Sequence, residues 1–436
     1  MTAHCDLVAG DGPPPPRRYI GSWPRPVSPA WHAKGQTRHD KSRGEGSRKV
    51  LKAPDDKASK MNSAHPPLFI GSEIYRHSSY GGWHPLRIPR VSTVMDLSRA
   101  LGWLPPVQFI NSPRAKPAAL HAFHTPEYVA ALAEAERAQF VSDAVRDRHN
   151  IGTHSNPIFG EMFRRPATSA GGAILAGELL AKGGAVYAPA AGTHHAMADR
   201  ANGFCYFNDP VLAMLSLRHH GAPRIAYVDI DAHHPDGVEA AFAADQDVLM
   251  LSVHEENRWP RTGQLEDAGA GQVFNLPVPQ GFNDTEMALI LERLILPAII
   301  AFRPDAIVLQ CGADAVTEDP QSRLTLSNNA HWAVVAALQE LSPRFLALGG
   351  GGYNPWSVGR LWTGVWGTMN GRPIPEHLPD AAQSVLAALE WDRRGRKLLP
   401  EPHWITTLRD APRTGPISAE LRERLDQIEG RLRAWV

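Results

Sequence analysis

The sequence predicts an α/β protein in which helices cover both faces of a mostly parallel central sheet, giving three layers. Short apolar runs rich in β-forming residues alternate with helical patterns along most of the chain, which is typical of parallel sheets. Each run is continuously apolar, so the strands are expected to be buried on both faces. Charged or glycine-rich segments follow four of the runs, and open parallel sheets bind ligands at the ends of their strands.

Five segments have the pattern of buried strands, at 185–188, 225–228, 248–253, 305–310 and 345–348. Helices are expected at 92–101, 167–180, 208–217, 284–301 and 330–341. Another helix is expected after Thr125, because threonine is a good N-cap and Pro126 fits the first helical turn. With no internal repeat and no second core, residues 66–371 are expected to form one domain.

The two ends of the chain differ from this central region. Residues 1–65 are rich in proline and basic residues without a hydrophobic period, so we expect a disordered tail. Translation from Met61 is an alternative that would leave most of this tail out. Residues 372–436 are interrupted by prolines and end in an amphipathic pattern over 418–435, so we expect a C-terminal extension whose terminal helix packs on the domain.

Composition narrows the class of protein. Of the 436 residues, 43% are hydrophobic and 21% are charged, as in ordinary globular proteins, and the formal net charge is zero. Basic residues prevail in residues 1–60, with 12 Lys and Arg against 6 Asp and Glu, so the rest is mildly acidic and direct nucleic-acid binding is not expected. Three scattered cysteines, no signal-peptide core and no membrane-spanning run predict a cytoplasmic protein without a membrane partner.

The stretch Arg224–Glu239 carries the strongest functional signal. Asp229, Asp231 and His233 come at every second position where a buried strand ends, so their side chains lie on one side of an extended chain. Taken alone, this pattern also fits a solvated loop with a capping aspartate. Buried charges are usually paired or bound to a metal, however, so a metal site is the favoured interpretation.

Three more clusters follow predicted strands: the pair His194-His195, the segment that ends in Asp314, and the glycines before Tyr353. Asp231, His233 and Asp314 together offer two carboxylates and one imidazole. Three protein ligands leave one position open, which is the arrangement of a catalytic zinc.

The remaining polar groups of these clusters fit metal-assisted amide hydrolysis. A bound zinc would acidify its water, and His195 could take up and return the proton. Tyr353 could donate to the oxyanion of a tetrahedral intermediate. Asp229 and Asp236 are the nearby carboxylates left to orient the histidines.

These motifs resemble the zinc-dependent histone deacetylase family, and most of all its bacterial branch of acetoin-utilisation-type deacetylases. The resemblance covers about residues 66–370 and rests on several motifs in order: Gly203-Phe-Cys-Tyr-Phe-Asn-Asp209, Asp229-Ile-Asp-Ala-His-His-Pro-Asp-Gly-Val238, Gly269-Ala-Gly271, Gln310-Cys-Gly-Ala-Asp314 and Leu348-Gly-Gly-Gly-Gly-Tyr353. It implies an arginase/deacetylase-like fold and a zinc-dependent deacetylase that hydrolyses the amide of acetyl-lysine in proteins.

The resemblance also implies roles for single residues. Zinc would lie on Asp231, His233 and Asp314, with His195 as general acid/base in front of Asp236. His194 would be an electrostatic partner held by Asp229, and Tyr353 would polarise the substrate carbonyl. The acyl-lysine stem would pass between Phe204 and Trp259 along Gly203. A structural potassium would lie on Asp229, Asp231, His233 and Ser252, and a second monovalent site near Phe242 and Val248.

Some positions depart from the family pattern. Trp259 stands where Phe is usual, Arg261 and Pro235 replace glycines, and Gln321 occupies a rim position that is often apolar. The loop at 152–157 lacks the Asp that binds the backbone of protein substrates, and His154 is the residue available to replace it. These changes concern the substrate more than the chemistry.

Three alternatives follow from the same residues. A two-metal arginase-like site would need carboxylates at Pro235 and Val316, so it is disfavoured. A deacetylase of acetylpolyamines or other small acetylated amines would need an acidic rim, which Glu255, Glu256 or Glu318 could supply. An inactive metal-bound scaffold is the third, although both histidines and Tyr353 are present. The sequence is compatible with an oligomer.

Overall fold

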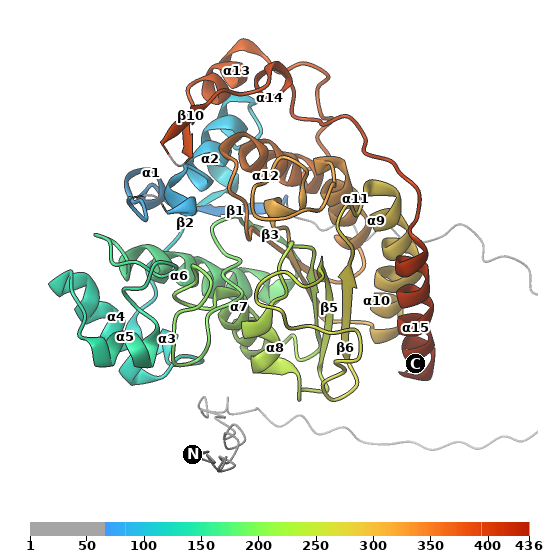
Figure 1. The fold of residues 1–436 in the computed structure, drawn as a ribbon, viewed down its shortest axis with the longest axis horizontal. Coiled ribbons are helices and arrows are strands. Elements are labelled where there is room, and N and C mark those ends of the chain that lie inside the picture. The colour runs from blue at the N-terminus through green and yellow to red at the C-terminus, as the bar shows by residue number, and fades with distance from the viewer. Residues whose placement is uncertain (1–65, 83, 394, 436) are drawn as a thin grey trace, which may run out of the picture. The chain divides into compact units, whose positions relative to one another are not determined.

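Eight strands form one sheet in the order β2-β1-β3-β8-β7-β4-β5-β6, and every pairing between them is parallel. The computed structural model describes residues 66–82, 84–393 and 395–435 (Figure 1). Helices lie on both faces of this sheet, which confirms the predicted α/β fold. The disordered tail predicted for residues 1–65, and the alternative start at Met61, lie outside the described residues.

The sheet consists of β1 (Leu68–Gly71), β2 (Phe109–Asn111), β3 (Gly184–Ala188), β4 (Ile225–Asp229), β5 (Val248–Glu255), β6 (Val273–Val278), β7 (Ala306–Gln310) and β8 (Arg344–Leu348). The helices up to the middle of the chain are α1 (Ile74–His77), α2 (Val91–Ala100), α3 (Pro117–Leu120), α4 (Pro126–Ala138), α5 (Asp143–His149), α6 (Arg164–Leu179), α7 (Asp209–His219) and α8 (Asp236–Phe242). The later ones are α9 (Asp284–Ile290), α10 (Leu296–Phe302), α11 (Asn328–Leu338), α12 (Pro355–Met369), α13 (Asp380–Ala387), α14 (Pro402–Thr406) and α15 (Ala419–Trp435).

Alternate residues of the strands enter two separate hydrophobic cores. In β4, Ala226 and Val228 pack into the core on the side of α2 and α9–α12, whereas Ile225 and Tyr227 face α6–α8. All residues of β4, β5, β6 and β7 are buried. Because side chains alternate across a strand, a continuously apolar run buries both faces at once, as the sequence predicted.

The elements that the sequence pattern missed have weak or unusual signals. Strands β1 and β2 are short, and the edge strand β6 contains a proline, Pro277, which is tolerated at a sheet edge. Helix α12 is buried on almost all sides and contains three glycines, which lower its helix propensity. The helix predicted over 284–301 is divided by a π-helical turn at Leu291–Ile295, where Pro297 lacks the N–H needed to continue the α-helical pattern.

The C-terminal region after residue 371 contributes to the first of these cores. Helix α15 buries four residues at helical spacing, Leu421, Leu425, Ile428 and Leu432. The Arg360 guanidinium of α12 forms a buried ion pair with Asp410, 2.7 Å between nitrogen and oxygen. A two-stranded hairpin, β9 (Trp391–Arg393) and β10 (Arg396–Leu398), lies between α13 and α14. The domain boundary at residue 371 stays a prediction, since one core spans it.

None of the helices in the described ranges is long and apolar enough to cross a membrane.

His124 is a buried histidine with a structural role, and its hydrogen bonds require a neutral imidazole. Its Nε2 accepts a hydrogen bond of 2.9 Å from the Asn208 N–H, and its Nδ1 faces the Ala198 carbonyl at 3.3 Å. Burial lowers the pKa of His124 to about 3. The unfolded chain binds the proton near the ordinary histidine pKa of about 6.5. The contribution of the neutral His124 to the free energy of unfolding is therefore fully present above that pH and is lost as the pH falls.

We expect the unfolding free energy to fall by about 2 kcal/mol between pH 8 and pH 5 through this one group. The change His124→Gln should remove this part of the slope, measured by urea unfolding at several pH values. His121→Gln is the matched control, because His121 is exposed three residues away. Equal slopes in both variants would contradict the assignment.

Candidate active site

The candidate site lies where four adjacent strands end. In the sheet, β3, β8, β7 and β4 are consecutive neighbours, and all four run in the same direction. Their carboxyl ends carry His194-His195, Tyr353, Asp314 and Asp231 in turn. The parallel register thus brings together side chains that are up to 160 residues apart, at the edge where such sheets bind ligands.

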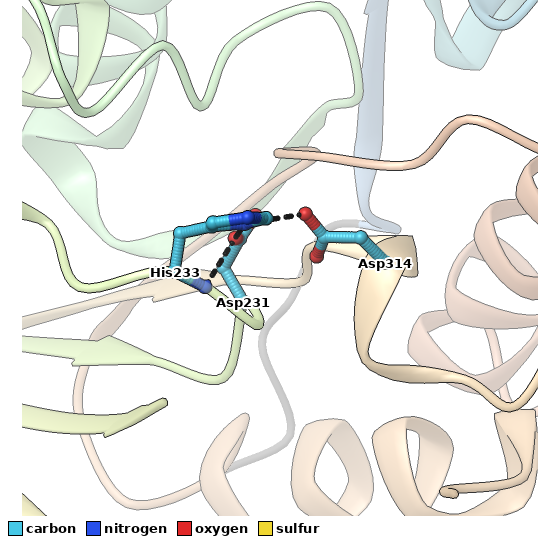
Figure 2. Close-up of side chains that lie close together, drawn as sticks. All are labelled: Asp231, His233 and Asp314. Carbon is cyan, nitrogen blue, oxygen red and sulfur yellow. Dashed lines mark hydrogen bonds and ion pairs between the residues drawn. The ribbon is translucent and has the colours of Figure 1, made fainter. Parts of the chain in front are cut away.

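Asp231, His233 and Asp314 form the centre of the site (Figure 2). The His233 Nδ1 lies 2.9 Å from the Asp314 Oδ2 and 3.3 Å from the Asp231 Oδ1. Potential ligand atoms of the three residues all lie within 4.8 Å of one another, and the three side chains are buried. The structure therefore brings together the three residues expected to hold a metal.

The electrostatics of this triad favour a bound cation. Burial alone would lower the pKa of His233, but the carboxylates of Asp314 and Asp231 raise it to about 10. Burial would raise the pKa of Asp231, yet His194 and His233 hold it well below its usual range. Two buried carboxylates need a compensating positive charge. Together with the imidazole they form a set of ligands that suits a divalent ion such as zinc.

The glycines around the triad are required by close approach. A Cβ on Gly312 would lie 2.0 Å from the Asp231 Oδ2, and one on Gly351 would lie 2.0 Å from the Asp314 Oδ2. The Gly351 N–H donates to the Asp231 Oδ2 at 2.7 Å. The glycine run thus lets the backbone after β8 reach both carboxylates, which a side chain would prevent.

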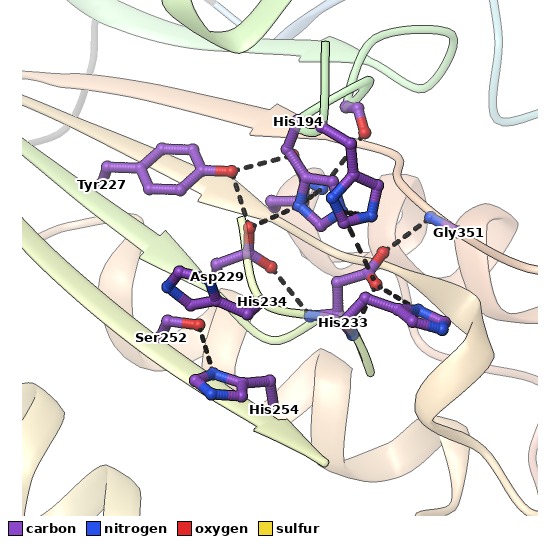
Figure 3. A network of polar contacts seen from close by, with 12 residues as sticks. His194, Tyr227, Asp229, His233, His234, Ser252, His254 and Gly351 are labelled. Carbon is purple, nitrogen blue, oxygen red and sulfur yellow. Dashed lines mark hydrogen bonds and ion pairs between the residues drawn. The ribbon is translucent and has the colours of Figure 1, made fainter. Parts of the chain in front are cut away.

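The two histidines after β3 are each held by a carboxylate, and Figure 3 shows the pair of His194 and Asp229. The His194 Nδ1 lies 2.9 Å from the Asp229 Oδ2, and the His195 Nδ1 lies 2.7 Å from the Asp236 Oδ1. The two Nε2 atoms are 2.8 Å apart. Both pairings agree with the partners expected from the sequence.

Their surroundings separate the two imidazoles in protonation. Burial would lower the pKa of His194, but the carboxylates of Asp229 and Asp231 raise it to about 9. Burial and the charge of His194 lower the pKa of His195 to about 4, against the opposing effect of Asp236. At neutral pH, His194 is therefore cationic and His195 neutral. Such a separation marks which group can act as a base.

Several supporting residues escaped the sequence analysis. The Tyr227 hydroxyl donates to the Asp229 Oδ2 at 2.7 Å, and the Gln310 Nε2 lies 2.6 Å from the His194 Nδ1 (Tyr227 in Figure 3). Asn202 donates to the Asp236 Oδ2 at 3.0 Å, so it steadies the carboxylate behind His195. Tyr227 and Gln310 could have been found as polar residues within apolar strands, whereas the local sequence around Asn202 carries no such signal.

A surface pocket leads to His195 and His233. It has a volume of about 430 Å³, and the predicted substrate residues Gly203, Phe204, Trp259, Gln321 and His154 all line it, together with Tyr353. The Trp259 ring lies 4.6 Å from the His195 ring, between ring centroids, and Trp259 is 43% exposed. The indole therefore contacts the His195 imidazole and is also open to solvent. A Cβ on Gly203 would meet the Trp259 ring at 2.2 Å, and Gly203 also has a positive φ of 50°. We call this the substrate pocket.

Tyr353 stands at the base of the substrate pocket with its backbone fixed. Its N–H donates to the Asp319 Oδ2 at 2.6 Å, and its ring lies 5.9 Å from that of Phe204. Burial raises the pKa of Tyr353 well above its ordinary value. The phenol therefore keeps its proton and can serve as a hydrogen-bond donor.

The residues predicted to hold potassium come from the adjacent strands β4 and β5 and from the loop after β4. Ser252 is the register partner of Asp229 in the adjacent strand, and its Oγ lies 2.8 Å from the His254 Nδ1 (Figure 3). Phe242 and Val248 are buried in the core under α8. Both monovalent sites stay predictions.

Two other arrangements for a metal are disfavoured. Glu318, His403 and Asp410 also cluster, but Arg413 pairs with Glu318 and Arg360 with Asp410, so these carboxylates are already neutralised. Pro235 and Val316, which would have to be ligands in a two-metal site, offer no side-chain donor atoms, and Val316 is fully inside the apolar core.

Comparisons with known proteins agree with this site. Residues 84–369 match the model of the histone deacetylase domain. The acetoin utilization protein AcuC of Bacillus subtilis is 31% identical over 327 residues, which is 72% of this chain and 84% of that protein. The histone deacetylase RPD3 of Saccharomyces cerevisiae is 31% identical over 69% of this chain and 71% of its own length.

Solved structures give the same result. The crystal structure of a histone deacetylase homolog from Aquifex aeolicus superposes with a TM-score of 0.79 at 35% identity, covering 84% of this chain and all of that one. A homolog complexed with SAHA matches equally well, with the same TM-score and coverage. The chain therefore belongs to the histone deacetylase family of hydrolases, and within it to the bacterial acetoin-utilisation type.

Proposed function

We propose that this protein is a zinc-dependent deacetylase that hydrolyses the amide of acetyl-lysine in proteins. The observation that carries the proposal is the placing of a neutral His195 and a buried Asp-His-Asp triad together at the base of one open pocket. A metal bound by Asp231, His233 and Asp314 would polarise the substrate carbonyl and acidify a water molecule.

The residues of the chain divide the remaining work. His195, oriented by Asp236, takes the proton of the attacking water on its Nε2, which lies next to the His194 Nε2, and returns it to the leaving amine. The cationic His194, held by Asp229, stabilises negative charge next to it. Tyr353 donates its hydroxyl proton to the developing oxyanion, and Phe204 and Trp259 line the route of the lysine stem.

The charges near the mouth favour a protein substrate over an acetylpolyamine. A polyamine is a cation and needs a free carboxylate at the rim. Each of the three acidic candidates is already paired with an arginine: Glu255 with Arg258, Glu256 with Arg424 and Glu318 with Arg413. Of these, Glu255 is also buried. This pairing removes the acidic rim that the polyamine alternative requires.

His233→Ala should abolish binding of the catalytic metal, because it removes the ligand shared between both carboxylates. The metal content of zinc-loaded, dialysed protein should fall from about one equivalent to nearly none. His403→Ala is the control, since it tests the alternative cluster and should leave the metal content unchanged. The reverse result would move the metal to the second cluster.

Tyr353→Phe should keep the metal but lower turnover about 100-fold or more, because the ring still packs while the oxyanion donor is lost. Metal analysis and steady-state kinetics on the same preparation separate the two effects. A variant with the wild-type rate would take the phenol out of the mechanism.

The substrate is tested by assaying the zinc form on an acetyl-lysine peptide and on acetylated polyamines in parallel, with a hydroxamate as inhibitor control. We expect peptide turnover that the hydroxamate blocks. Turnover of the polyamines alone would instead assign a small acetylated amine as substrate. No turnover of either, with one zinc bound, would support an inactive metal-bound scaffold.

A further inference from the structure

A second pocket opens beside the substrate pocket, and the C-terminal hairpin forms one of its walls. It has a volume of about 110 Å³ and shares Gln321 and Tyr353 with the substrate pocket. Its other charged and aromatic lining residues are His84 and Arg87, from the segment before α2, and Trp391, Asp392 and Arg393, from β9. Burial lowers the pKa of His84 to about 4, so its imidazole adds no positive charge at neutral pH. We call this the hairpin pocket.

The hairpin pocket presents two guanidinium groups that are not neutralised. The Arg87 Nη1 donates to the Gly82 carbonyl at 2.9 Å, which leaves its other N–H groups unused. Arg393 is exposed. Within the described ranges, neither guanidinium pairs with a carboxylate. Asp392 is the one acid among the described lining residues, and it forms no ion pair with either arginine.

This arrangement fits a carboxylate supplied by the substrate. Arginine offers several donors in a planar fork, which matches a carboxylate better than other anions of its size. The mostly buried Trp391 gives an apolar wall for the methylene groups that precede such a carboxylate. A cationic side chain would meet two positive charges in the same place.

We propose that the hairpin pocket binds an acidic side chain next to the acetyl-lysine, so that the enzyme prefers acetyl-lysine flanked by glutamate or aspartate. The inference rests on the proposed function and narrows its substrate class. The two pockets adjoin, because Gln321 and Tyr353 line both of them. Successive residues of an extended peptide are about 3.3 Å apart, so a residue close to the acetyl-lysine in the chain is the one expected to enter the hairpin pocket.

Three peptides test this, each with one acetyl-lysine flanked by alanines, by glutamates or by lysines. The ratio of kcat/KM for the glutamate peptide to that for the lysine peptide should be about threefold to tenfold in the wild type. Arg87→Ala and Arg393→Ala should each bring the ratio towards one. Asp392→Asn should raise it, because the change removes a negative charge in the pocket wall that repels an acidic side chain.

Arg396→Ala is the matched control, since Arg396 faces Arg393 across the same hairpin but does not line the pocket. It should keep the wild-type ratio. Turnover of the alanine peptide measures the deacetylase activity without any flanking charge. If this peptide is turned over but the wild-type ratio is one, the inference is overturned and the proposed function stands. The same holds if Arg87→Ala and Arg393→Ala leave the ratio unchanged. Lack of turnover of all three peptides would overturn both.

Discussion

The burial of two carboxylates and an imidazole at one edge of the sheet is the constraint on which the rest of the site depends. Asp231 and Asp314 are almost inaccessible to water, and His233 lies between them. An isolated buried carboxylate is very costly, so each must be compensated by a counter-charge or by hydrogen bonds. Backbone N–H groups of Ala232 and Gly351 supply part of this compensation. A divalent metal would supply the larger part.

This constraint explains why small and polar residues surround the site. The two carboxylates leave no room for a Cβ at Gly312 or Gly351. Next to the triad, His194 and Tyr227 are both hydrogen-bonded to the buried carboxylate of Asp229. In that network the carboxylates stabilise His194 as a cation, and burial together with this charge keeps His195 neutral. The difference between the two histidines thus follows from their surroundings.

Charges at the surface follow a different rule, because water screens them and each carboxylate can pair with an arginine nearby. In the C-terminal region, Arg424 pairs with Glu256 and Arg413 with Glu318, and Trp391 and Arg393 line a pocket that adjoins the substrate pocket. The C-terminal extension therefore does more than pack on the domain, because it contributes charged side chains beside the substrate pocket.

The sequence by itself determined the five inner strands β3, β4, β5, β7 and β8 and the residues at their ends, because a strand buried on both faces leaves a continuous apolar run. The triad and the histidine pair were predicted from motifs at those ends, whereas the lining residues of the substrate pocket came from the resemblance to the family. Helix α12, with its three glycines, has a low helix propensity, and the sequence analysis missed it.

Only the tertiary structure decided which groups are neighbours without being neighbours in the chain. Asn202 behind Asp236, Asp319 under Tyr353, and the hairpin arginine beside Gln321 come together through loops whose paths have no periodic signal. Likewise, no pattern in the chain revealed that Arg258, Arg413 and Arg424 neutralise the acids near the mouth. Strand ends can be read from local hydrophobicity, whereas charge pairing depends on distances that the fold alone sets.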